Sequence, residues 1–246
     1  MKKIILFSII IILNSCYNLI AKKIGLTDLE PQLTKLKVPH KDVYFLGIMH
    51  LGKKEYYDNV KIKITNFQNE GYTFYVEGAS SFENGKKTID TISLKKMRKI
   101  TGLDFSIKYS QMTNDIFKKM VEKIQLQDQP NYEDLGAINI IKVDYNFKQL
   151  ISFFETENTI VKLDSCDLAT PLGIEFKCSQ LNKETRDKFD KEILLEKRNK
   201  QLADSILNSK HKKIVVVYGK KHLDGVQKLI LNNNFPSGGY PYPPLY

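Results

Sequence analysis

Two histidines and one glutamate occupy positions in this chain where metal and hydrolytic chemistry is common. His50 follows Gly47 by three residues, and His222 follows Gly219 by the same interval. Each glycine closes a short run of β-branched and aromatic residues, a pattern typical of a buried strand. Glu77 directly follows a third such run. Because the carboxyl ends of parallel strands share one edge of a sheet, we expect these three side chains to converge there.

Two imidazoles and one carboxylate form a ligand set that suits a divalent transition metal with positions left open for water. An ion held there would lower the pKa of that water and polarise a carbonyl group. His50, His222 and Glu77 are therefore the predicted metal ligands, and Glu77 is alternatively the general base. The competing interpretation is that the two histidines are unrelated loop residues and that the glutamate is a surface acid.

One of the few arginines lies on the apolar side of a predicted helix. Helical spacing over about residues 185–207 gives one apolar face, and Arg198 and Asn199 lie on or beside it. An unpaired buried charge is costly. We therefore expect Arg198 to bind a substrate carboxylate, to stabilise a developing oxyanion, or to orient Glu77. The alternative is that its side chain extends past the helix edge to solvent.

The apolar pattern places the elements that would carry these residues. Buried strands are expected at residues 43–47, 72–76 and 214–218. An amphipathic helix between the first two makes a β-α-β unit, which indicates a parallel sheet. A weak capping box at Asn146 and Gln149 predicts a helix start, and residues 159–163 are expected to form a short strand. The predicted fold class is α/β: a mainly parallel sheet flanked by helices, with a helical middle section and two similar halves that each contribute a Gly-x-x-His motif.

The N-terminus indicates export and lipidation. A pair of lysines precedes an apolar run at residues 4–13 that is too short to span a bilayer. Residues 13–16, Leu-Asn-Ser-Cys, resemble the bacterial lipoprotein cleavage box, whose cysteine carries the lipid. We expect residues 1–15 to be a signal peptide, Cys16 to be lipidated and residues 16–41 to form a tether. A plain signal peptide and an uncleaved anchor are the alternatives. The predicted location is the bacterial cell envelope outside the cytoplasm, in the periplasm or on the outer surface.

The charge of the chain argues against a nucleic-acid partner. Removal of Lys2 and Lys3 lowers the formal charge from +10 by two, to +8, and nearly all of the excess is lysine. Proteins that recognise nucleic acid generally use arginine for bidentate contacts. We therefore expect no nucleic-acid partner, and the lysine-rich surface suits solvent and an anionic membrane.

After Cys16, the chain retains Cys166 and Cys178. In an oxidising compartment two cysteines twelve residues apart are able to form a disulfide, which would contribute about 2–3 kcal/mol. Sequence alone does not show whether their Cα atoms approach closely enough, so two free thiols are the alternative.

Taken together, the motifs resemble the TraB/GumN superfamily, whose relatives include the TIKI proteases and the pheromone-shutdown proteins of conjugative plasmids. The resemblance spans about residues 42–232 and is carried by Gly47-x-x-His50, Glu77-Gly78, Arg198-Asn199 and Val217-x-Gly219-x-x-His222-Leu223-x-Gly225. Gln129 and Asp144 also resemble family positions, with a helix-start acid as the alternative for Asp144. The chain differs from the family at Lys220 and Lys221, where small residues are usual.

The resemblance implies an α/β domain over residues 42–234, with two similar halves sharing a cleft. The composition of residues 235–246 predicts a Pro/Gly-rich tail after it. It implies a metalloprotease-like hydrolase that acts on peptides or proteins, with manganese or cobalt as the ion and zinc as an alternative. Glu77 and Arg198 are the expected catalytic residues, and Arg198, Asn199 and Asp144 the expected substrate-binding residues. Because related folds carry esterase chemistry or bind haem, the alternative function is a non-catalytic lipoprotein that sequesters a peptide or haem.

Overall fold

The computed structural model describes residues 19–78, 89–111 and 115–233. The predicted signal peptide at residues 1–15, the predicted lipidation site Cys16 and the tail at residues 235–246 lie outside the described residues. Within the described ranges, no helix is both long and apolar enough to cross a membrane.

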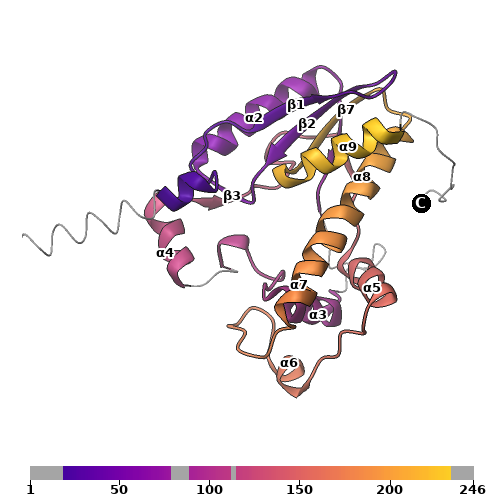
Figure 1. The fold of residues 1–246 in the computed structure, drawn as a ribbon. Coiled ribbons are helices and arrows are strands. Elements are labelled where there is room, and N and C mark those ends of the chain that lie inside the picture. The colour runs from indigo at the N-terminus through magenta and orange to yellow at the C-terminus, as the bar shows by residue number, and fades with distance from the viewer. Residues whose placement is uncertain (1–18, 79–88, 112–114, 234–246) are drawn as a thin grey trace, which may run out of the picture.

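A mixed sheet forms the centre of the described structure (Figure 1), and its strand order is β1-β2-β7-β4-β6. Its parallel strands are β2 (Asp42–Ile48), β7 (Lys213–Gly219), β4 (Thr73–Val76) and β6 (Ile140–Lys142). Strand β1 (Gln32–Leu36) pairs antiparallel with β2 at one edge. Because β7 is buried on both faces from Ile214 to Tyr218, its sequence is a continuous apolar run. The predicted α/β class with a mainly parallel sheet is confirmed, and the two similar halves stay a prediction.

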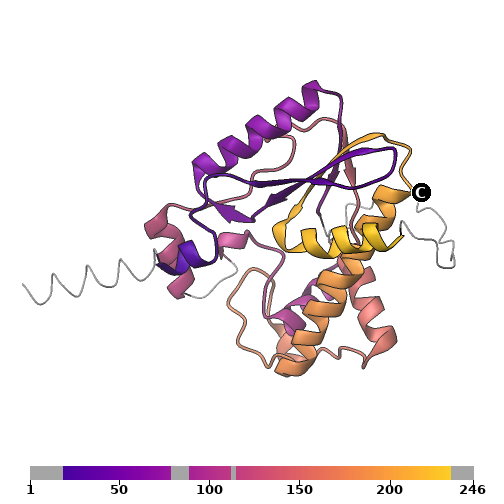
Figure 2. The same cartoon turned by 45° about the horizontal axis from the view of Figure 1, so that its top comes forward.

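Helices cover both faces of this sheet. Helix α2 (Lys54–Asn69) packs on one face through Val60 and Ile64, which belong to the same buried cluster as Val215 of β7. Helices α8 (Arg198–Leu207) and α9 (Leu223–Asn233) pack on the other face. Figure 2 shows α2 on one side of the strands and the pair α8 and α9 on the other. The periodic apolar residues of α2 thus have the partner that an amphipathic helix needs.

A helical region extends below the sheet in Figure 1. Its core is formed by α3 (Thr91–Thr101), α5 (Phe147–Glu157) and the π-helical segment η2 (Phe189–Lys197). Segment η2 joins α7 (Lys183–Lys188) to α8, so the predicted long helix is present with a π-helical middle. The predicted capping box at the start of α5 is also confirmed.

Two predictions about the stretch after α5 are decided by the structure. The strand expected at residues 159–163 is wrong: these residues join no ladder, and the N–H of Val161 donates to the side chain of Glu155. Cys166, in α6 (Ser165–Ala169), forms a disulfide with Cys178, and their Cα atoms are 5.8 Å apart. The disulfide alternative is therefore confirmed.

The N-terminal lead-in packs against a small unit at one end of the sheet. A short helix over residues 19–23 lies beside α4 (Asp115–Ile124), as both views show (Figure 1, Figure 2). Strands β3 (Leu51–Gly52) and β5 (Gln127–Asp128) pair antiparallel next to it. The residues buried between these segments are Ala21, Leu26, Leu51, Met120, Val121, Ile124 and Leu126. Residues 16–41, expected to be a tether, thus include a docked helix and strand β1.

Candidate functional site

The three predicted ligands lie past the carboxyl ends of adjacent parallel strands. His50 follows β2, Glu77 directly follows β4, and His222 ends the short helix η3 (Lys220–His222) after β7. Nε2 of His50 lies 3.9 Å from Oε1 of Glu77. A methyl group built on Gly219 would lie 3.1 Å from Oε2 of Glu77 and 3.6 Å from Cδ2 of His222. The structure therefore brings all three side chains to one place.

Glu77 is the buried anion of this group. Its Oε1 accepts a hydrogen bond of 2.7 Å from Nη2 of Arg198, and its Oε2 accepts one of 2.6 Å from the backbone N–H of Gly219. Burial raises the pKa of Glu77, but the positive charge of Arg198, with contributions from His50 and His222, lowers it by more. The pKa of Glu77 therefore lies below its usual value, and the side chain is a carboxylate at neutral pH.

Arg198 is held between two acids. Its Nε and Nη2 donate to the two carboxylate oxygens of Asp144 at 2.9 and 2.6 Å, while Nη2 also donates to Glu77. Its Nη1 donates to the carbonyl of Leu194 at 3.4 Å. Burial lowers the pKa of Arg198, but Asp144 and Glu77 raise it well above the ordinary value, so the guanidinium is charged. Arg198 thus contacts Glu77 directly and the solvent-exposed alternative is wrong, while its expected roles in catalysis and substrate binding stay predictions.

Asp144 pairs with Arg198 from the end of the neighbouring strand β6. It follows β6, its side chain is fully buried, and its Oδ2 also accepts a hydrogen bond of 3.0 Å from the backbone N–H of Gly78. The carboxylate thus fixes both Arg198 and the residue after Glu77. In this structure Asp144 contacts protein groups, and its expected role in binding substrate stays a prediction.

Side-chain amides orient both imidazoles in the same way. Nδ1 of His222 lies 2.7 Å from Oδ1 of Asn199, and Nδ1 of His50 lies 3.3 Å from Oε1 of Gln129. An amide oxygen can only accept, so each of these contacts is a hydrogen bond when Nδ1 carries the proton. A neutral imidazole in that tautomer keeps its lone pair on Nε2, the form in which histidine binds a metal.

Local backbone features hold the amides in place. The backbone N–H of Gln129 donates to the carbonyl of His50 at 3.0 Å, so the two residues lie opposite each other, directly beside the paired strands β3 and β5. A Cβ built on Gly225 would lie 2.1 Å from Nδ2 of Asn199, so this glycine is required for the amide to approach His222. Burial and the charge of Arg198 lower the pKa of His222 to about 4, which keeps its imidazole neutral at pH 7.

A tyrosine that sequence reasoning missed covers His50. The ring of Tyr109, in the 3₁₀ turn η1 (Tyr109–Gln111), lies 5.1 Å from the imidazole of His50. The next residue, Ser110, donates from its backbone N–H and its hydroxyl to the carboxylate of Asp128, at 2.8 and 2.6 Å. These bonds fix η1 against β5 and therefore hold the tyrosine over the histidine. Nothing in the sequence around Tyr109 indicated this contact.

Two further tyrosines line the buried side of the site. The hydroxyl of Tyr132 donates to the backbone carbonyl of Glu77 at 2.8 Å. The ring of Tyr218 lies 4.8 Å from the imidazole of His222 and packs edge to face. Tyr132 belongs to the Gln-Pro-Asn-Tyr segment that begins at Gln129, and this proximity was the available signal for it. Both rings restrict the movement of the groups that they contact.

The donor chemistry of the two histidines fits a divalent transition metal. Both imidazoles contact their amides through Nδ1 and leave Nε2 for an ion, and two buried carboxylates, Glu77 and Asp144, surround the single guanidinium of Arg198, which favours a cation. In the described ranges, however, no three His, Cys, Asp or Glu side chains are grouped so that they could hold an ion. Both oxygens of Glu77 already accept hydrogen bonds, so as a third ligand it would share an oxygen with Arg198 or Gly219.

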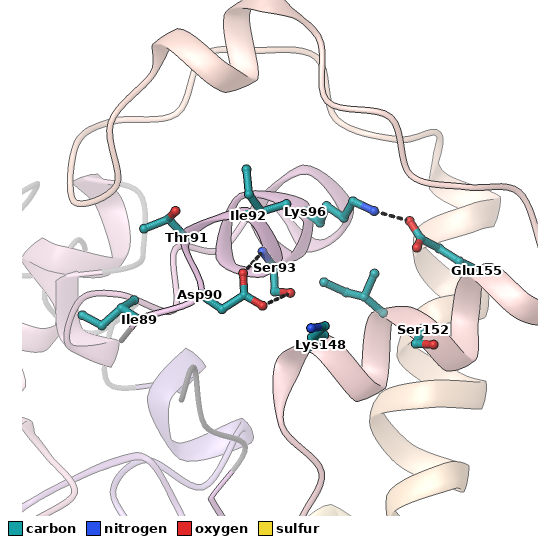
Figure 3. A pocket seen from close by; sticks show the side chains of 10 residues that line it. Ile89, Asp90, Thr91, Ile92, Ser93, Lys96, Lys148, Ser152 and Glu155 are labelled. Atoms are coloured by element: carbon teal, nitrogen blue, oxygen red, sulfur yellow. Dashed lines mark hydrogen bonds and ion pairs between the residues drawn. The ribbon is translucent and has the colours of Figure 1, made fainter. Parts of the chain in front are cut away.

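A separate pocket lies between α3 and α5 (Figure 3), with a volume of about 560 Å³. An ion pair of 2.6 Å between Lys96 and Glu155 lies at one side of it, and Asp90 caps the start of α3. None of the predicted site residues lines this pocket. The chemistry expected from the sequence therefore does not lie there.

No protein-family model, curated protein or solved structure matches this chain. The resemblance to the TraB/GumN superfamily therefore rests on the motifs themselves, and membership of that family stays a prediction.

Proposed function

We propose that this protein is a lipid-anchored extracytoplasmic metal-dependent hydrolase that cleaves peptide bonds, built as a TraB/GumN-like domain. One observation carries the proposal: His50 and His222 are both fixed by amide oxygens at Nδ1, which leaves both Nε2 lone pairs available beside the ionised Glu77. This is the arrangement by which proteins orient histidine ligands. Peptide as the substrate comes from the family resemblance.

The residues of the chain have distinct roles in this proposal. His50 and His222 would hold the ion through Nε2, with manganese or cobalt favoured and zinc as the alternative. A bound divalent cation would supply Lewis acidity, which polarises a carbonyl group and makes water more acidic. Because its pKa is lowered, Glu77 is a weak base at neutral pH, so its fixed charge supports a ligand role better than a general-base role.

Arg198 is proposed to act together with Glu77. It keeps the glutamate ionised and in place, and its partners take the donor of Nε, both donors of Nη2 and one of the two donors of Nη1. Direct stabilisation of negative charge on a substrate through Nε or Nη2 would require Arg198 to exchange one of these bonds. The amide oxygen of Asn199 is engaged by His222, so a contact between Asn199 and a substrate would use its NH₂ group.

Peptide hydrolysis by the purified protein tests the proposal. Activity is measured after chelator treatment and after addition of manganese, cobalt or zinc, with His50→Ala and His222→Ala as variants. His40→Asn is the control, because His40 is exposed and has a φ of 57°, a conformation that asparagine also adopts. We expect metal to restore activity to the unsubstituted chain and to the control. Each of the two site variants should lose activity by a factor of about 100 or more.

Activity that is indifferent to chelator and to His50→Ala would contradict the enzyme. Binding of peptide, or a Soret band after addition of haem, without any hydrolysis would instead identify the binding lipoprotein. The proposed anchor is tested separately: Cys16→Ser should abolish incorporation of labelled palmitate and move the protein to the soluble fraction, while unchanged labelling would contradict lipidation.

A further inference from the structure

An exposed apolar surface lies immediately after the predicted lipidation site. In the segment that begins with the helix over residues 19–23, Leu19, Ile20 and Ile24 are 71%, 50% and 48% exposed. Between them, Lys22 and Lys23 are also exposed. We call these five residues the N-terminal face. Several large apolar side chains exposed next to one another on a surface commonly mark a contact with a membrane or another protein.

The opposite side of the same segment is fixed to the body of the protein. Ala21 is fully buried, and Leu26 packs with Leu51 of β3 and with Met120 of α4. The backbone N–H of Leu26 donates to the carbonyl of Ala21 at 2.8 Å and closes the turn. The N-terminal face is therefore presented by a docked segment, and its direction is set by the rest of the fold.

The position of Cys16 in the sequence identifies the occupant of this surface. Cys16 precedes Leu19 by three residues. Even a fully extended chain spans only about 3.3–3.6 Å per residue, so acyl chains on Cys16 would hold the N-terminal face within roughly 11 Å of the bilayer surface. An apolar face at this distance from a membrane is covered most readily by the membrane itself.

The charges on and around the face fit an anionic lipid surface. Within the described part of the chain, Lys22 and Lys23 form no ion pair. The nearest acids in sequence, Asp28 and Glu30, pair with Lys220 at 3.9 Å and with Lys63 at 3.1 Å. The positive charge of the two lysines is thus available for anionic head groups, each of which attracts a nearby lysine.

We propose that the N-terminal face lies on the phospholipid surface, with Leu19, Ile20 and Ile24 at the boundary of head groups and acyl chains and the two lysines against anionic head groups. This inference rests on the proposed lipid anchor. It adds a second contact to the anchor, because one lipid attachment holds a protein near a membrane without fixing its orientation.

The same contact specifies the substrate class of the proposed hydrolase. Leu51, which packs beneath the N-terminal face, directly follows His50. The side chain of His50 is 44% exposed, whereas Glu77 and His222 are buried, so the site opens on the side of His50. The substrate is therefore a peptide segment held close to the membrane surface.

Binding to vesicles tests the surface without the anchor. The mature chain with Cys16→Ser is mixed with vesicles of phosphatidylcholine, with or without phosphatidylglycerol, and bound protein is measured by sedimentation. Adding Ile20→Ser and Ile24→Ser should lower the partition coefficient roughly tenfold. Adding Ile138→Ser and Ile160→Ser, at isoleucines that are 76% and 62% exposed elsewhere, should leave it unchanged.

A charge variant separates the two components of the contact. Lys22→Glu with Lys23→Glu should remove the preference for vesicles that contain phosphatidylglycerol and leave binding to neutral vesicles nearly unchanged. The proposed surface would be overturned if both pairs of isoleucine substitutions weakened vesicle binding equally. It would also be overturned if the Cys16→Ser chain without further substitutions showed no measurable binding. Circular dichroism of each variant confirms that a loss of binding does not come from unfolding.

The substrate class is tested with the lipidated protein in vesicles. A peptide tethered to the vesicle surface should be cleaved at least about tenfold faster than the same peptide free in solution. Equal rates would overturn the substrate assignment. Absence of all hydrolysis would overturn the proposed function while the vesicle-binding result stands, so the two failures are distinguishable.

Discussion

The buried carboxylate of Asp144 provides the sharpest test of how the site is held together. Its side chain is fully buried, and it accepts hydrogen bonds from Nε and Nη2 of Arg198 and from the backbone of Gly78. Asp144→Asn preserves the shape but replaces one acceptor oxygen with an NH₂ group that faces donors. Removing one partner of a buried ion pair costs about 3–5 kcal/mol. Because Glu77 still pairs with Arg198, we expect the lower end, about 3 kcal/mol.

Urea unfolding followed by circular dichroism measures this loss. Asp58→Asn is the matched control, because the carboxylate of Asp58 lies 2.7 Å from Nζ of Lys54 but its side chain is 54% exposed. Exposed ion pairs of this kind contribute less than about 1 kcal/mol. If Asp144→Asn destabilised the protein no more than Asp58→Asn, with equal dependence on urea concentration, the buried pair would not be the element that supports the site.

Three further predictions concern pH, space and the disulfide. Burial and the nearby guanidinium lower the pKa of His222 from 6.5 to about 4, so the unfolded chain binds more protons between these values. The free energy of unfolding should therefore fall by up to about 3 kcal/mol as pH decreases through this window, and urea titrations of His222→Gln should lack this part of the loss. Gly219→Ala should lower the rate of peptide hydrolysis roughly tenfold, because the added methyl group would lie 3.1 Å from Oε2 of Glu77. Gly78→Ala is the control in the same assay and should retain the parent rate, because its added methyl group would have no atom within 4 Å. Cys178→Ser should cost about 2–3 kcal/mol in urea unfolding under oxidising conditions, and an unchanged midpoint would show that the disulfide contributes nothing.

The meeting of the site residues could be predicted because it depends on local signals. Glycine after an apolar run marks the end of a buried strand, and parallel strands that end together bring the following residues to one edge. His50 and His222 follow such a glycine by three residues, and Glu77 directly follows its apolar run. Helical spacing placed Arg198 on or beside an apolar face, and the cost of an unpaired buried charge made an acidic partner one of the expected outcomes.

The orientation of the same side chains could not be predicted, since it depends on contacts between distant segments. Gln129 lies 79 residues from His50, and no local pattern shows which nitrogen its amide would contact. Tyr109 lies against His50 beside a serine that is hydrogen-bonded to Asp128 of β5, a contact between segments far apart in the sequence. The buried residues of the π-helical segment η2, Phe189 and Ile193, are four positions apart as in an ordinary helix, so its altered hydrogen bonding was not visible in the sequence.

Strand β1 was missed for a different reason. Among its five residues, Leu36 is buried while Gln32, Leu33 and Lys35 are exposed. A short edge strand needs little apolar surface, because it is stabilised by its pairing with β2. Its composition therefore resembled that of a polar tether.

Metal content tests the central claim most directly. The protein is purified without added metal, analysed by mass spectrometry for bound elements, and titrated with manganese by calorimetry after chelator treatment. We predict a single divalent transition-metal ion per chain in the parent protein and in His40→Asn, and none in His50→Ala or His222→Ala. A parent chain that binds no such ion, or an ion that persists after both histidine substitutions, would contradict the account.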